Sequence, residues 1–166
     1  MVAANSTRAF EQRAVLKTAV VATGSYANVT GLEFYAEAGL TYRFEFHYVW
    51  DAGAVTTGAA FSINGTATPT ALAYSHETGL TTTTTTLGTG LSDYNLPAAT
   101  GVTSPATTGN SAVVWGVITP LTSGFVTGRV IAENLTDAIT VKAGLTYVQW
   151  ERIADQGIPA NAANNA

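Results

Sequence analysis

Aromatic residues occupy every second position over most of residues 41–50. A period of two is the side-chain period of a β-strand, so this segment predicts a strand with one aromatic face. Aromatic side chains on one strand face form the core of a sandwich more often than a carbohydrate-stacking platform, and we therefore expect them to be buried. The aromatic positions are Tyr42, Phe44, Phe46, Tyr48 and Trp50.

Short alternating runs punctuated by Gly, Asn, Asp and Pro recur along the chain. Residues 32–36 also alternate, and the Gly in the connection to residues 41–50 predicts a hairpin between the two runs. Residues 7–17, which Ser6 can cap, are the nearest helix candidate, but they fit the entry to a first strand equally well. Further strands are expected at 14–21, 58–63, 70–74, 112–118, 124–132, 139–141 and 145–152.

These elements predict an all-β fold, a jelly-roll-like β-sandwich of about eight or nine strands. The pentapeptide Ala-Gly-Leu-Thr-Tyr occurs at 38–42 and again at 143–147, each time at the start of an expected strand. Its Gly favours a turn and its Thr-Tyr favours a strand, so both copies indicate the same turn chemistry. Five residues are equally compatible with convergence and with an internal duplication.

Residues 75–110 differ in character from the rest of the chain, because a tract of six threonines at 81–86 is followed by repeated Gly and Pro. A connection of this length is usually functional, disordered or ordered by a partner, which predicts a Thr/Gly-rich loop insertion. Threonine is also strongly β-prone, so residues 82–87 fit an edge strand, or a strand that pairs with a neighbouring subunit, equally well.

Charged residues make up only 11% of the 166 residues, and the net charge is -4. Such a surface suits packing against copies of the chain or against other subunits, where charges would have to be desolvated.

Seven Lys and Arg residues are too few to neutralise a nucleic-acid backbone. No apolar run approaches the length that spans a bilayer, and the lack of Cys excludes disulfides and thiolate chemistry. We expect one domain at 14–153 between short arms at 1–13 and 154–166.

Few residues offer catalytic chemistry. The two histidines are His47, for which a structural or surface role is expected, and His76. His76 could join a Ser-His-acid arrangement, but no Gly-x-Ser-x-Gly nucleophile sequence is present to support one. A glycan hydrolase would need two of Glu33, Glu37 and Glu45 to converge and would lose activity on replacement of Glu33 or Glu45, although solvated strand faces explain all three adequately. The aspartates do not follow calcium-loop spacing. The chain is therefore expected not to be an enzyme and to bind neither metal nor cofactor.

Several runs together resemble a β-rich domain of tailed-bacteriophage virion proteins, over about residues 14–153. Their order and spacing carry the resemblance more than any single run. The runs are Val-Thr-Gly-Leu-Glu-Phe at 29–34, Ala-Gly-Leu-Thr-Tyr-Arg-Phe-Glu at 38–45, Thr-Gly at 57–58, Phe-Ser-Ile-Asn-Gly at 61–65, Val-Trp-Gly-Val-Ile-Thr-Pro at 114–120, Ser-Gly at 123–124 and Ile-Thr-Val-Lys-Ala-Gly at 139–144.

The resemblance implies a jelly-roll module of capsid decoration proteins, often a homotrimer, or of minor tail and fibre proteins. Because no long shaft precedes the domain, we expect a decoration protein that binds the major capsid protein on the outside of the head. The alternative is a tail or fibre domain that recognises host-surface glycans. The arms are expected to dock on the capsid, and the threonine tract with two residues after it is expected to contact other subunits or to be displayed. These residues are Thr7, Phe10, Arg13, Ile158 and Pro159 in the arms, and Thr82, Thr84, Tyr94 and Leu96 in and after the tract.

Overall fold

The computed structural model describes residues 12–96, 103–134 and 137–153, and these residues form β-strands and no helix. The all-β prediction is therefore confirmed. The eleven strands are β1 (Gln12–Val15), β2 (Val20–Ala22), β3 (Ala27–Ala36), β4 (Tyr42–Ala52), β5 (Ala59–Gly65), β6 (Thr68–Gly79), β7 (Thr85–Leu91), β8 (Asn110–Thr122), β9 (Gly124–Ala132), β10 (Ile139–Val141) and β11 (Tyr147–Arg152).

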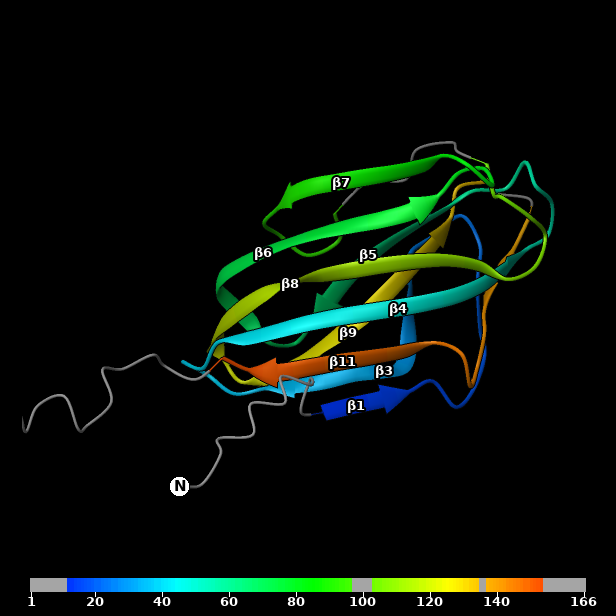
Figure 1. Cartoon of the computed structure of the whole chain (residues 1–166). Helices are drawn as coiled ribbons and strands as arrows, with labels where there is room; N and C mark the ends of the chain where they lie inside the picture. The colour runs from blue at the N-terminus through cyan, green and yellow to red at the C-terminus, as the bar shows by residue number, and fades with distance from the viewer. Residues whose placement is uncertain (1–11, 97–102, 135–136, 154–166) are drawn as a thin grey trace, which may run out of the picture.

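The strands form two antiparallel sheets that lie face to face (Figure 1). The larger sheet has eight strands, with the order β1-β11-β4-β8-β6-β7 from edge to edge and with β10 and β2 extending from β4. The smaller sheet has three strands in the order β3-β9-β5. Consistent with a β-sandwich, the inward side chains of both sheets form one core.

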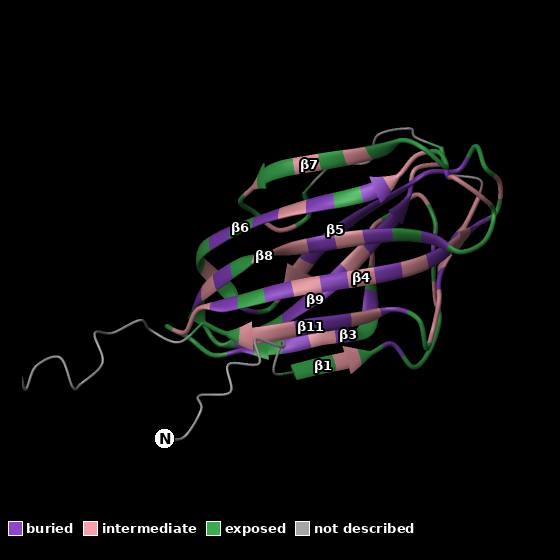
Figure 2. Ribbon diagram, in the orientation of Figure 1, coloured by how far each residue is buried: buried purple, intermediate pink, exposed green. Residues whose placement is uncertain are grey.

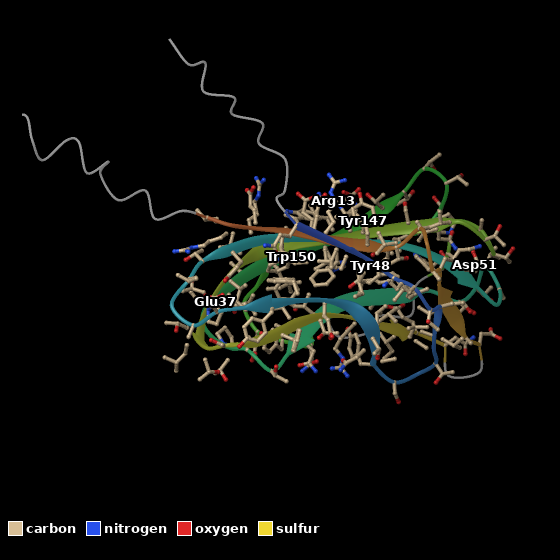
Figure 3. All side chains as sticks on the ribbon, turned by 90° about the horizontal axis from the view of Figure 1, so that it is seen from below. Arg13, Glu37, Tyr48, Asp51, Tyr147 and Trp150 are labelled. Carbon is tan, nitrogen blue, oxygen red and sulfur yellow. The ribbon has the colours of Figure 1, made fainter. Side chains whose placement is uncertain are left out.

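The aromatic alternation of residues 41–50 corresponds to the alternation of buried and less buried side chains along β4. Its five aromatic side chains are buried, while the residues between them are exposed or half-buried, as the striping of β4 in Figure 2 shows. Tyr48 lies between the two sheets in Figure 3, and its ring centroid is 4.5 Å from that of Phe61 in β5. Burial raises the pKa of the Tyr48 hydroxyl far above its ordinary value. The prediction of an aromatic core is confirmed.

The predicted hairpin between residues 32–36 and 41–50 is wrong. Residues 32–36 belong to β3, which pairs with β9 in the smaller sheet, whereas β4 pairs with β8, β10 and β11 in the larger sheet. The connection at 37–41 thus crosses from one sheet to the other. Both strands still turn apolar side chains toward the same core, because they face it from opposite layers.

The repeated pentapeptide has the same structure in both places. Gly39 and Gly144 have positive φ angles of 76° and 75°, which is the left-handed region that favours glycine. In each copy the final tyrosine is the first residue of a strand, β4 or β11. These two strands are neighbours, and the register pairs Tyr147 with His47. The predicted turn-then-strand pattern is confirmed for both copies.

Two strands were not expected as separate elements. The predicted strand at 14–21 divides into β1, which pairs with β11, and β2, which pairs with β10. The strand is interrupted where it meets the turn between β10 and β11. There the Leu16 amide donates to the Thr146 carbonyl at 2.9 Å, and the Leu16 carbonyl accepts from the Gly144 amide at 2.8 Å. The other additional strand is β7, within the predicted loop at 75–110. The end of β6 also enters that segment, so the edge-strand alternative is the one observed.

Candidate functional site

The predicted contact residues fall into three groups in the structure. Thr7, Phe10, Ile158 and Pro159 lie outside the described residues. Arg13 is exposed in β1, where its backbone pairs with Gln149, so it is part of the larger sheet (Figure 3). The remaining four residues, Thr82, Thr84, Tyr94 and Leu96, lie at one side of the sandwich, around β7 and the segment that follows it.

The threonine tract forms the tight turn between β6 and β7. The amides of Leu80 and Thr81 both donate to the carbonyl of Thr84, at 2.8 and 3.2 Å, which reverses the chain. The side chains of Thr82 and Thr84 are exposed and point away from the core. Thr82 also lines a hollow of about 450 Å³, whose wall combines Thr, Ser and Asn side chains with Pro, Ala and Val side chains and has Glu77 as its one carboxylate.

Residues 92–96 run from β7 across to β5 of the other sheet and are held there by a buried hydroxyl cluster. The Tyr74 hydroxyl lies 2.9 Å from the Asp93 carbonyl oxygen and within hydrogen-bond distance of the Leu96 carbonyl. It also accepts a hydrogen bond from the Leu96 amide at 3.2 Å. The Ser62 hydroxyl donates to the same Leu96 carbonyl. This cluster joins β6 of the larger sheet to β5 of the smaller one.

Tyr94 strengthens the same attachment. Its hydroxyl donates to the Ala67 carbonyl at 2.7 Å, its ring packs against the core, and burial raises its pKa to about 12. The Asn95 amide donates to the Ile63 carbonyl at 2.9 Å, which covers the outer edge of β5. The Tyr94 hydroxyl therefore makes its hydrogen bond within its own chain, whereas Leu96 is partly exposed.

Removing the Tyr74 hydroxyl is expected to loosen this attachment. Tyr74→Phe leaves the Leu96 amide and the Asp93 carbonyl without their partner, which should lower the free energy of unfolding by about 2 kcal/mol. Urea unfolding measures that loss, and chymotrypsin should cleave faster after Tyr94 in the folded variant. Tyr94→Phe, which loses one hydrogen bond, should cost only about 1 kcal/mol. Equal stability and equal cleavage rates for wild type and Tyr74→Phe would contradict this role.

The second histidine, His76, lies in β6. The ring is buried, it points into the sandwich, and among the described residues its Nδ1 atom has no hydrogen-bond partner. Burial lowers its pKa, so the ring is neutral at neutral pH. The neighbouring Glu77 is exposed on the opposite face of β6. His76 is thus a neutral, buried side chain of β6.

The two carboxylates considered for glycan hydrolysis lie on opposite outer surfaces. Glu33 projects from the smaller sheet and accepts a hydrogen bond from the Thr127 hydroxyl at 3.2 Å. Glu45 projects from the larger sheet. Its carboxylate oxygen lies 3.1 Å from Nε2 of His47 and accepts a hydrogen bond of 2.7 Å from the side-chain amide of Gln149. Because the core separates the two glutamates, they cannot flank one glycosidic bond. His47 stacks on Tyr147, with ring centroids 4.5 Å apart.

One exposed aromatic pair, Tyr35 and Phe125, is not among the residues that the sequence singles out. Tyr35 in β3 and Phe125 in β9 are paired in register on the outer face of the smaller sheet, with ring centroids 5.3 Å apart. Their side chains are 51% and 44% exposed, which is high for such large apolar groups. The signal was present in the sequence, since Tyr35 alternates with the buried Phe34 and Ala36. This pair adds apolar area to a surface that otherwise carries Glu33 and Arg129.

No group of three or more His, Asp or Glu side chains that could hold a metal ion occurs in the described part of the chain. Within the same residues, no helix is long and apolar enough to cross a membrane. Comparison with known proteins finds no family model, no curated protein and no solved structure that matches this chain.

Proposed function

We propose that this chain is a bacteriophage virion structural protein that decorates the outside of the capsid and stabilises the head. The observation that carries the proposal is the exposed surface that contains no charge. Residues 80–92 include no Asp, Glu, Lys or Arg, and most of them are exposed. Proteins that remain free in solution usually carry charges on such a surface, whereas subunits of an assembly bury it.

The order of strand pairing supports a jelly-roll-like topology, which the sequence resemblance implies. The pairs β1–β11, β2–β10, β3–β9 and β4–β8 are nested one inside the next along the chain. Nested antiparallel pairs form when a long ribbon of two chain segments is rolled into two layers, as in jelly rolls. In the tailed-bacteriophage family that the sequence resembles, a jelly-roll module occurs in capsid decoration proteins and in minor tail and fibre-like proteins.

The proposed mechanism is mechanical. Each subunit binds the major capsid protein and other copies of itself, as a homotrimer, and so bridges neighbouring coat subunits against internal DNA pressure. Interfaces of about 1,000 Å² suffice for specific attachment, and repetition over a lattice multiplies the effect of each contact. The arms remain the proposed docking segments, while Leu96, Thr82 and Thr84 are side chains available on the exposed side.

The test uses phage heads prepared without this protein. Added full-length protein is expected to co-sediment with the heads in saturable amounts and to raise the temperature at which they release DNA. A variant that lacks residues 1–11 but keeps β1 should fold and bind more weakly. Failure of the full-length protein to bind any head form would refute capsid decoration. Undiminished binding of the shortened variant would refute only docking through the N-terminal arm.

The exposed Tyr35–Phe125 pair favours a second candidate, a minor tail or fibre domain that binds host-surface glycans. Aromatic rings beside polar side chains are the usual means of holding a sugar ring, and here Glu33 and Thr127 lie next to the pair in register. Antibody labelling of intact virions distinguishes the two candidates. Label on the head supports decoration, whereas label confined to the tail supports this alternative.

A further inference from the structure

The edges of the two sheets differ in how well they are protected from pairing with another strand. A free edge presents unpaired amides and carbonyls, and natural proteins protect such edges with short strands, charges, bulges or covering segments. In the described residues, β1 is four residues long and carries Arg13, and β2 is three residues long. The ladder of β3 is interrupted by a bulge between Asn28 and Glu33, and Asn95 covers the edge of β5.

The edge strand β7 has little of this protection. It has seven residues without charge or proline, and it lies at the outer edge of the larger sheet, next to β6 only (Figure 1). A bulge near Gly90 shifts the register of β7 on β6 between Tyr74 and His76, so the distortion is confined to the C-terminal end of β7. The half of β7 at residues 85–88 pairs regularly with β6, and no strand of the described residues pairs with its other side.

The hydrogen-bond pattern identifies which groups of β7 point outward. The Leu80 amide donates to the Thr84 carbonyl, so Leu80 and Thr84 are a hydrogen-bonded pair. Along an antiparallel ladder, hydrogen-bonded pairs alternate with pairs that do not bond each other. Thr86 and Gly88 therefore direct their backbone groups toward β6, while Thr85 and Leu87 direct theirs away from it. The Leu87 side chain is 60% exposed, on the same outer face as Glu77, its partner in register.

We propose that β7 pairs antiparallel with β7 of a second copy of this chain, so that two larger sheets join into one continuous sheet. Pairing about Leu87 would satisfy the outward amides and carbonyls of Thr85 and Leu87 and bring the two exposed leucines together. A partner strand that carried charges would place them opposite Thr and Leu, which offer no counter-charge. An uncharged strand avoids repulsion against itself, and a two-fold contact requires only one surface on each copy.

This inference is independent of the proposed head decoration, because a two-fold contact through β7 is compatible with a capsid, a tail or a free dimer. It also differs from the proposed trimer, since a three-fold axis would need another surface. The uncharged threonine turns would lie at opposite ends of the joined ladder, where they remain available to the coat protein.

The test measures the mass of the purified full-length protein by sedimentation over a range of concentrations. Wild type should form a dimer, and Leu87→Lys should raise its dissociation constant about 100-fold or more, because two like charges would face each other at the two-fold axis. Leu121→Lys is the matched control: Leu121 is 65% exposed, but it lies in β8, which β6 separates from β7. This control should leave the dissociation constant unchanged.

Two further measurements guard against misfolding and against other assemblies. Thr85→Pro removes one outward amide and should also weaken the dimer, with unchanged circular dichroism. Hydrogen exchange of the Leu87 amide should be slow at high concentration and fast on dilution. A wild-type monomer, equal effects of Leu87→Lys and Leu121→Lys, or a trimer insensitive to Leu87→Lys would each overturn the β7 contact. None of these results would affect binding to phage heads, which is measured separately.

Discussion

Replacing Phe46 with alanine is expected to lower the free energy of unfolding by about 4 kcal/mol, since truncation of a buried phenylalanine removes its transfer energy and leaves a cavity. Phe46 is fully buried in β4, at the centre of the aromatic face. Its ring centroid is 5.7 Å from that of Phe44 and 6.3 Å from those of Phe34 and Tyr48. The loss therefore affects contacts within β4 and contacts between the two sheets.

Urea unfolding followed by fluorescence and circular dichroism measures this effect. Phe125→Ala is the matched control, because it makes the same chemical change at an exposed position of the smaller sheet. It should cost less than about 1.5 kcal/mol, mostly through its edge-on contact with Tyr35. Equal losses for the two variants would mean that the aromatic face of β4 is not the main core of the protein.

The parts of the fold that the sequence predicts well are those where apolar and polar residues alternate. The strand at 124–132 and the short strand at 139–141 have the predicted limits, and β4 differs by two residues at most at either end. Burial of one strand face imposes this pattern locally, so that no knowledge of the partner strands is needed.

Strand partners are a different matter, as the wrong hairpin at 32–50 demonstrates. A strand with an inward apolar face looks the same whether its neighbour along the chain pairs beside it or faces it from the opposite layer. The end of β6 illustrates a second limit: His76 and Thr78 point inward there but are polar. Their alternation with half-buried Ser75 and exposed Glu77 is therefore not visible as an apolar pattern, and the sequence predicts a loop there.

The subunit contacts proposed for the threonine tract and for Tyr94 remain predictions. The uncharged tract at 81–86 was identified from composition, but its division into a turn and the edge strand β7 depends on pairing with β6. Tyr94 was expected to contact another subunit, yet its hydroxyl binds Ala67 in its own chain. Sequence alone does not distinguish these roles, because a tyrosine in a loop can serve either as an internal hydrogen-bond donor or as an exposed contact.

Gly116→Ala is expected to lower the free energy of unfolding by about 3 kcal/mol, because β8 passes too close to β6 for a side chain at this position. Gly116 pairs with Phe44 on one side and Tyr74 on the other. An added Cβ would lie 2.4 Å from the Ala73 carbonyl oxygen and 2.5 Å from the Tyr74 Cβ. Backbone on β6 would have to move, and such movement would displace the Tyr74 hydroxyl from residues 93–96.

Thermal and urea unfolding measure the loss, and chymotrypsin cleavage after Tyr94 reports the displacement. Gly53→Ala is the control, since the nearest atom to its added Cβ is the Ala138 carbonyl oxygen at 3.4 Å, an ordinary contact. That variant should stay within about 0.5 kcal/mol of wild type. If Gly116→Ala were as stable as Gly53→Ala, β6 and β8 would not be packed as closely as described. The attachment of residues 92–96 to Tyr74, and with it the position of the edge strand β7 that precedes them, would then require a different explanation.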